Sequence, residues 1–322
     1  MHDTTDHDAT DHDAIDGDAD SAAIDHDTTD QGATDHDPTD QGDTDTSRDV
    51  DQSDDVGGPG AVSDGRSIEV TVDVVGTPDD VWRAVATGAG ISSWYVAHAV
   101  EEREGGEVRF SFGPGMEATG RVAVWDPPTR FLIDNGEQVG LAFEWTIEPL
   151  PDDEPACRVR LVNSGFGADP ESLAQLEAMR NGWGIFLTNL RLHLEHFPGR
   201  SATPSLPMAM WPAPRDEAWA RLLGDLGLPA ELAAGERVTV SSPDAPAMSG
   251  TVAAVGADHV AFVLDEPTAG TAFLAAESVG DAVAVSVWSY LYDDVGAELV
   301  ARDQGAWQEW LSARADDPDA RR

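Results

Sequence analysis

One long amphipathic stretch, from Asp169 to Phe197, most constrains the fold of this chain. Its apolar residues recur every three or four positions, which predicts a helix with a single apolar stripe. The stripe consists of Leu173, Leu176, Met179, Trp183, Phe186, Leu187, Leu190 and Leu194. Asp169 suits the N-cap and Pro170 the first turn, while Pro198 and Gly199 end the helix. Such a helix must lie against a large apolar surface.

That surface is expected from a run of strands that precedes the helix. Segments that alternate apolar and polar residues are separated by turn sequences. They are Ser67–Val75, Glu107–Phe112, Glu117–Trp125, Arg130–Asp134, Leu141–Glu148 and Cys157–Asn163. Thr77 and Pro78 predict the start of a short helix that runs to about Ala86. An antiparallel sheet must cover its apolar face, so we predict an α+β fold in which a curved antiparallel sheet wraps around the long helix.

A curved sheet around one helix leaves a space that side chains do not always fill. Aromatic residues of the concave face, of the helix and of the segment before the strands are expected to line it. As ligand-binding residues we predict Trp94, Tyr95, Phe110, Phe112, Phe143, Trp145, Trp183 and Phe186. Trp82 is expected in the core, whereas core and pocket roles are both open for Trp94 and Tyr95. Burial of one aromatic ring contributes about 1.5–3 kcal/mol, which is reason to retain it even without a ligand.

Several motifs in this half occur in a fixed order. They are TPDDVWRAVATGAGISSWYV, EGGEVRFSF, GRVAVWDPPTRFLIDN, FEWTIEPL, CRVRLVNSGF and NGWGIFLTNLRLHLE. They resemble the START-like, helix-grip superfamily called SRPBCC, and within it the family of activators of a heat-shock chaperone ATPase. The matching positions are Pro78, Val81, Trp82, Trp94, Gly120, Pro127, Pro128, Arg130, Gly182 and Trp183. The resemblance covers residues 67–198 and implies a helix-grip (START/Bet v-like) fold with an internal cavity, but no defined reaction.

The second half repeats the order of these elements with shorter loops. The corresponding pairs are Trp82 and Trp219, Gly120 and Gly250, and Trp183 and Trp307. Strands are expected at Arg237–Ser241, Thr271–Ser278 and Ala282–Tyr290. We therefore predict a smaller, degenerate second START-like domain at 213–315, with Val and Ala where the first copy has Phe and Trp. A Pro-rich linker at 199–212 would join the two copies, and its LPMAMW segment would be the first strand of the second copy.

The N-terminal residues 1–66 differ in composition from the rest of the chain. They hold 21 of the 61 acidic residues, few aliphatic residues and a degenerate five-residue repeat built on Asp-His-Asp. Such a segment cannot bury enough apolar surface to offset its chain entropy, so we predict a disordered acidic tail, and a second one at 316–322. The repeated His and Asp residues suggest weak divalent-metal binding, but their spacing does not fit an EF-hand.

Few side chains outside the aromatic set suggest chemistry. Cys157, the only cysteine, is expected as a buried structural thiol rather than a nucleophile. His193 and His196 could share a metal, yet no third ligand is evident, so no metal and no cofactor are expected. His98 and His259 are expected to be isolated and exposed.

Two arginines leave a choice open. Arg158 and Arg160 share one face of their strand. Pointing outward they would pair with surface acids, and pointing inward they could hold a ligand carboxylate. No phosphate loop, nucleophile elbow or catalytic carboxylate pair is evident, so no catalytic residue is assigned.

These patterns predict a protein that binds a small apolar or amphipathic molecule without chemical turnover. The alternatives are a chaperone ATPase regulator, for which a chaperone would be the partner, and an enzyme that uses the same cavity. The net charge of −42 argues against binding to nucleic acids or anionic membranes. Since neither a signal peptide nor a membrane-spanning apolar run is evident, we expect a cytoplasmic protein without membrane insertion.

Overall fold

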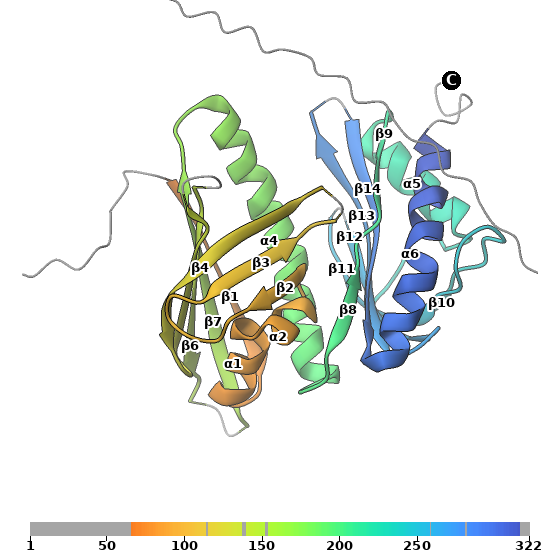
Figure 1. Ribbon diagram of the computed structural model, residues 1–322. Coiled ribbons are helices and arrows are strands. Elements are labelled where there is room, and N and C mark those ends of the chain that lie inside the picture. The colour runs from red at the N-terminus through yellow and green to blue at the C-terminus, as the bar shows by residue number, and fades with distance from the viewer. Residues whose placement is uncertain are drawn as a thin grey trace, which may run out of the picture. The chain divides into compact units, whose positions relative to one another are not determined.

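A computed structural model describes residues 66–113, 115–136, 140–151, 154–257, 259–280 and 282–315. The predicted tails at 1–66 and 316–322 lie outside the described residues, apart from Arg66, which begins the first strand. All described residues belong to one unit of the chain, Pro59–Arg322. They contain two antiparallel sheets, each followed by a long helix (Figure 1).

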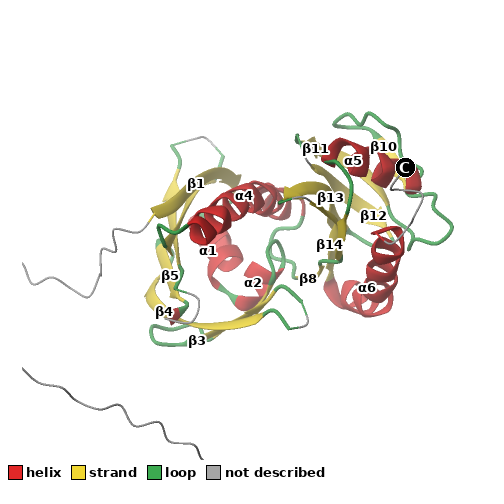
Figure 2. Cartoon of the chain, turned by 90° about the horizontal axis from the view of Figure 1, so that it is seen from above, coloured by secondary structure: helices red, strands yellow, loops and turns green. Residues whose placement is uncertain are grey.

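The first sheet has seven strands in the order β1-β7-β6-β5-β4-β3-β2. Its strands are β1 (Arg66–Val75), β2 (Ala97–Val100), β3 (Glu107–Ser111), β4 (Glu117–Asp126), β5 (Arg130–Asp134), β6 (Ala142–Pro149) and β7 (Ala156–Phe166). Two short helices, α1 (Pro78–Ala86) and α2 (Gly88–Ser92), connect β1 to β2, and α4 (Pro170–His196) follows β7. The sheet curves around α4, as Figure 2 shows from above. This arrangement confirms the predicted helix-grip fold, although β2 was not anticipated.

Residue Thr77 starts α1 as the sequence predicted. Its hydroxyl accepts a hydrogen bond from the Asp80 amide at 3.2 Å, and the Asp80 carboxylate accepts one from the Thr77 amide at 3.2 Å. This capping box pairs two amides that a helix leaves without partners. It also fixes the direction in which α1 leaves β1, and so places the buried face of α1 over the sheet.

We expect Thr77→Ala to lower the free energy of unfolding by about 1 kcal/mol, because the Asp80 amide loses its acceptor. Urea denaturation of the full chain would measure the change. Thr77→Ser keeps the hydroxyl and should retain most of the stability. If the serine variant lost as much stability as the alanine variant, the hydroxyl would not be the cause.

The second sheet has the strand order β10-β11-β12-β13-β14-β8, and β9 also pairs with β14. Its strands are β8 (Ala202–Ser205), β9 (Met208–Trp211), β10 (Arg237–Thr239), β11 (Ser249–Val255), β12 (His259–Glu266), β13 (Gly270–Val279) and β14 (Ala282–Tyr292). Helix α5 (Arg215–Asp225) follows β9, and α6 (Asp293–Ala315) follows β14. In both halves the first strand therefore pairs with the last strand, and a long helix follows, so the second half repeats the topology of the first in a reduced form.

Two glycines at matching places support this duplication. A Cβ on Gly120 in β4 would lie 2.8 Å from the Asp134 carbonyl oxygen, and a Cβ on Gly250 in β11 would lie 2.3 Å from the Val263 carbonyl oxygen. Real Cβ atoms do not approach backbone oxygens so closely. Both copies thus need a glycine where the neighbouring strand approaches most closely.

The stretch 199–212, predicted as a linker, contains two strands of the second sheet. Strand β8 pairs with the C-terminal part of β14, and β9 pairs with its N-terminal part. The LPMAMW segment largely coincides with β9. The second sheet therefore begins within four residues of the end of the first half, between Pro198 and Ala202.

Helix α4 is buried on two faces. One face, which includes Trp183, Phe186 and Leu190, belongs to the core under the first sheet. The other face, which includes Ile185 and Leu192, packs against β12, β13 and β14 of the second sheet. The opposite face of the second sheet packs against α5 and α6. The second sheet is consequently apolar on both faces, with α4 on one side and its own helices on the other (Figures 1 and 2).

Candidate functional site

The eight aromatic residues predicted to line the first cavity lie together between the first sheet and α4. Each is in ring contact with at least one other member of the set. We call Trp94, Tyr95, Phe110, Phe112, Phe143, Trp145, Trp183 and Phe186 the aromatic cluster. Strands β3 and β6, the segment that follows α2, the β3–β4 turn and α4 supply its members. The topology therefore brings together residues that are up to 92 positions apart, from Trp94 to Phe186.

Tyr95 lies at the centre of the aromatic cluster. Its ring centroid is 4.5 Å from that of Phe186, 4.9 Å from that of Trp183 and 5.9 Å from that of Phe112. Edge-to-face and tilted pairs at such distances are favourable beyond the area that they bury. Burial also raises the pKa of the Tyr95 hydroxyl, so the phenol stays protonated.

Trp94 anchors the segment that carries Tyr95. Its side chain is fully buried, and its indole Nε1 donates a hydrogen bond of 2.9 Å to the Ala84 carbonyl oxygen in α1. The ring packs edge-on against Trp145 in β6 at 5.4 Å. This residue therefore ties the short helices to the concave face of the sheet, and it has a structural role alongside its place in the aromatic cluster.

Most of the aromatic cluster is closed to solvent. Seven members are at most 9% exposed, whereas Phe112, in the β3–β4 turn, is 37% exposed. Met116, which follows in the same turn, is 52% exposed. In this structure the rings themselves occupy the space between the sheet and α4. A ligand would therefore have to displace rings, and the β3–β4 turn offers the exposed side from which it could do so.

Buried polar atoms without partners lie among the apolar side chains of the first half. Trp183 Nε1, Thr146 Oγ1, Asn163 Oδ1 and both side-chain polar atoms of Asn135 form no hydrogen bond with the described residues. Buried polar groups are normally paired with protein or with water. Of these, Trp183 Nε1 belongs to the aromatic cluster.

His98 corrects one expectation from the sequence, because it is not isolated. Its ring stacks on Phe110 at 5.3 Å and lies 5.5 Å from Tyr95, and its Nδ1 is 2.9 Å from the Val96 carbonyl oxygen. Burial lowers the pKa of His98 to about 4, so the imidazole is neutral at neutral pH. No local pattern predicted this placement, because AHAV is too short and too weakly patterned to indicate a strand.

The two arginines of β7 point outward. Arg158 donates to Asp73 at 2.7 and 2.8 Å, and Arg160 donates to Glu69 at 2.8 and 2.7 Å. These hydrogen bonds lower the pKa of each carboxyl group. Of the two alternatives left open by the sequence, the surface ion pairs are confirmed.

Cys157 is buried, as predicted for a structural thiol. Its Sγ lies 3.5 Å from the Gly76 carbonyl oxygen, and burial, with a smaller contribution from Asp80, raises its pKa. A raised pKa leaves less of the reactive thiolate at neutral pH.

His193 also makes a structural contact. Its Nδ1 lies 2.8 Å from the Tyr292 hydroxyl of β14, while the side chain of His196 is 38% exposed. Within the described ranges, no three His, Cys, Asp or Glu residues lie close enough together to hold a metal ion.

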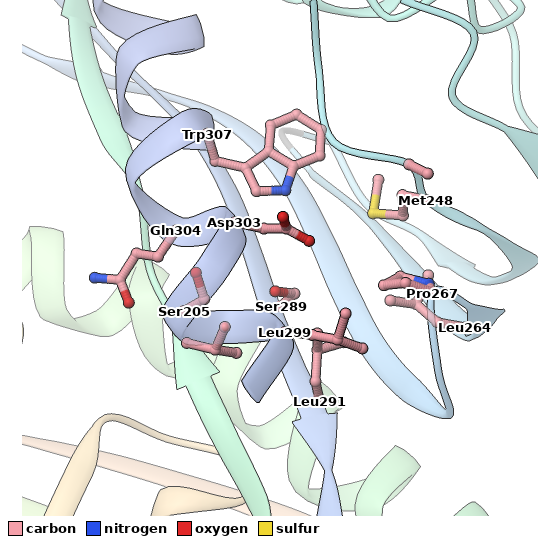
Figure 3. Close-up of a pocket in the computed structure, with 12 residues that line it drawn as sticks. Ser205, Met248, Leu264, Pro267, Ser289, Leu291, Leu299, Asp303, Gln304 and Trp307 are labelled. Carbon is pink, nitrogen blue, oxygen red and sulfur yellow. The ribbon is translucent and has the colours of Figure 1, made fainter. Parts of the chain in front are cut away.

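The second half contains a small cavity in the corresponding place, between its sheet and α6 (Figure 3). Its volume is about 20 Å³, which is room for one or two water molecules. Met248, Leu264, Leu291 and Trp307 supply apolar walls, and Asp303 projects from α6 toward them. A space of this size does not take an organic ligand, so the aromatic cluster remains the stronger candidate site.

No described helix has the length and apolar composition needed to cross a membrane. Comparison with curated proteins finds no match. Residues 76–195 match the family described as "Activator of Hsp90 ATPase homolog 1-like protein". This segment runs from the residue before Thr77 to the last turn of α4, so it includes every member of the aromatic cluster.

Several solved structures are similar to the chain at low identity. Protein MLL2253 from Mesorhizobium loti is 19% identical with a TM-score of 0.36, over 41% of this chain and 98% of that one. The di-domain ARO/CYC BexL from the BE-7585A biosynthetic pathway is 17% identical with a TM-score of 0.37, over 78% and 99%. The Aha1 dimer from Colwellia psychrerythraea is 17% identical with a TM-score of 0.35, over 41% and 97%. The motif resemblance found in the sequence and this family match agree over residues 76–195, which make up less than half of the chain.

Proposed function

We propose that the first domain binds a small apolar or amphipathic molecule at the aromatic cluster, without chemical turnover. The observation that carries the proposal is the cluster itself, in which eight aromatic rings from distant parts of the chain meet between a curved sheet and one helix. Apolar pockets with few polar groups are typical sites for such ligands. The family match over the same residues supports a ligand-binding domain.

The side from which the ligand enters would be the β3–β4 turn. Phe112 and Met116 expose apolar surface there, and Phe112 is in ring contact with Tyr95. Outward movement of this turn would open the aromatic cluster without disturbing the anchor at Trp94. The ligand would then replace ring–ring contacts of the same kind, which keeps the cost of opening low.

The titratable groups Tyr95, in the aromatic cluster, and His98, beside it, favour binding over acid–base catalysis. An efficient general acid or base has a pKa near the working pH. The pKa of His98 is lowered to about 4 by burial, and that of Tyr95 is raised by burial. At neutral pH the imidazole is therefore unprotonated and the phenol is protonated, and neither exchanges its proton readily.

Binding of 2-ethylnaphthalene to the full chain, measured by equilibrium dialysis, tests this proposal. Tyr95→Leu removes several ring contacts, and we expect it to weaken binding about tenfold or more. Phe131→Leu is the matched control, because Phe131 is equally buried but contacts Trp82 and Trp125 instead of the cluster. Equal losses in both variants, or no binding to the wild type, would argue against the aromatic cluster as the site. Native mass spectrometry of the purified protein would reveal a molecule that is retained from the cell.

A further inference from the structure

The second sheet contacts the aromatic cluster. Trp288 of β14 stacks on Phe186 of the cluster, with ring centroids 5.3 Å apart and an interplanar angle of 9°. Strand β14 places Trp288 and Tyr290 on the same face, because they are two positions apart. That face looks toward α4 and the first sheet, and Figure 2 shows β14 and β8 beside α4 and α2.

Two hydrogen-bond donors at this contact have no partner among the described residues. They are Trp183 Nε1 and Trp288 Nε1, and both atoms are buried. The two tryptophans flank Phe186, because Trp183 lies 6.1 Å from it in α4 and Trp288 lies 5.3 Å from it in β14. Burial raises the pKa of the Tyr290 hydroxyl, and a hydrogen bond with the Asn189 side chain lowers it, so this hydroxyl has a partner. The two indole donors therefore both lie beside Phe186.

The neighbouring polar groups show that pairing is possible here. Asn189 Nδ2 donates to the Trp94 carbonyl oxygen at 3.0 Å, and its Oδ1 accepts a hydrogen bond of 2.7 Å from the Thr271 hydroxyl. The Tyr292 hydroxyl, on the same face of β14 as Tyr290, has His193 as its partner at 2.8 Å. Against these paired groups, the two unpaired indole donors beside Phe186 indicate an acceptor that comes from a bound molecule.

We propose that the second domain completes the binding site of the first, and that Trp288 Nε1 and Trp183 Nε1 donate hydrogen bonds to an oxygen of the bound molecule. This inference rests on the proposed function and adds the ligand's chemistry to it. The ligand is a flat apolar molecule that carries a neutral acceptor such as a ketone oxygen. Neutral donors suit a neutral acceptor, whereas recognition of a carboxylate would normally use an arginine.

Two probes of nearly equal size and shape separate the parts of this proposal. 2-Acetylnaphthalene carries a ketone oxygen, and 2-ethylnaphthalene carries a methylene group in its place. We expect the full chain to bind the ketone about tenfold more tightly than the hydrocarbon, because the buried donors gain an acceptor. Trp288→Phe keeps an aromatic ring and removes the donor, so it should lower this ratio severalfold while hydrocarbon binding changes little.

Tyr292→Phe is the control, because its hydroxyl already has a partner in His193. It removes a hydroxyl from the same strand and face, and it should leave the ratio unchanged. A purely structural role of Trp288 would lower the affinity for both probes together. Equal wild-type affinities for the two probes, or a ratio that survives Trp288→Phe, would overturn this inference and leave the proposed function standing. Failure of both probes to bind would overturn the proposed function itself.

Discussion

Replacement of Trp94 by alanine should lower the free energy of unfolding by about 3–5 kcal/mol, the range for large aromatic truncations in packed cores. The side chain is fully buried, its rings contact Tyr95 and Trp145, and its Nε1 pairs the Ala84 carbonyl oxygen. The substitution thus removes packing on both sides of the short helices and leaves a buried carbonyl without its donor. Denaturation of the full chain in urea, followed by circular dichroism, would measure the loss.

Two further variants make this result specific. Trp94→Phe keeps most of the ring volume and should cost clearly less than the alanine variant. Phe112→Ala removes a ring that is 37% exposed and should cost about 1 kcal/mol or less. If Trp94→Ala cost no more than Phe112→Ala, the α1–α2 segment would not be anchored through Trp94 as described.

Acidification should destabilise the protein through His193. Burial lowers the pKa of this residue from 6.5 to about 4, so the folded state favours the neutral imidazole. Its contribution to stability is complete above pH 6.5 and is lost as the pH falls from 6.5 toward 4. By linkage, the folded protein should lose about 2 kcal/mol through this group between pH 7 and pH 5.

The change in unfolding free energy from pH 7 to pH 5 in His193→Gln would test this expectation. The variant retains a polar group opposite the Tyr292 hydroxyl but cannot take up the proton, so its loss should be smaller than that of the wild type. The large negative charge of the chain contributes equally to both proteins and cancels in the comparison. His196→Gln, which alters an exposed side chain of the same helix, should behave like the wild type. An equal pH dependence in His193→Gln and the wild type would contradict the buried, neutral state of His193.

Local patterns predicted much of the first half. The stripe from Leu173 to Leu194 and the caps at Thr77 and Asp169 predicted α1 and α4, and the structure places both helices as expected. The predicted aromatic residues meet because alternation in the strands and the three-to-four spacing in α4 determine which side chains face the interior. These signals are periodic and local, so one sequence is enough to recognise them.

Contacts between the two halves could not be predicted in this way. Ile185 and Leu192 lie off the predicted stripe of α4, and nothing in their spacing indicates that the second sheet covers them. One signal was present, because nearly every residue of β13 is apolar or small, which is typical of a strand buried on both faces. Trp288 was not expected to reach the aromatic cluster, since its contact with Phe186 depends on how two separately predicted domains dock.

Because α4 is buried on two faces, the first copy depends on the second. A free-standing helix-grip domain can keep polar side chains on the outer surface of its last helix, but here Ile185, Leu192 and Phe197 would meet water if the second copy were removed. A fragment that ended after α4 would therefore be prone to self-association. The second copy shields these apolar residues of the first from water. That role is reason enough to retain the second copy, even if its own interior binds no ligand.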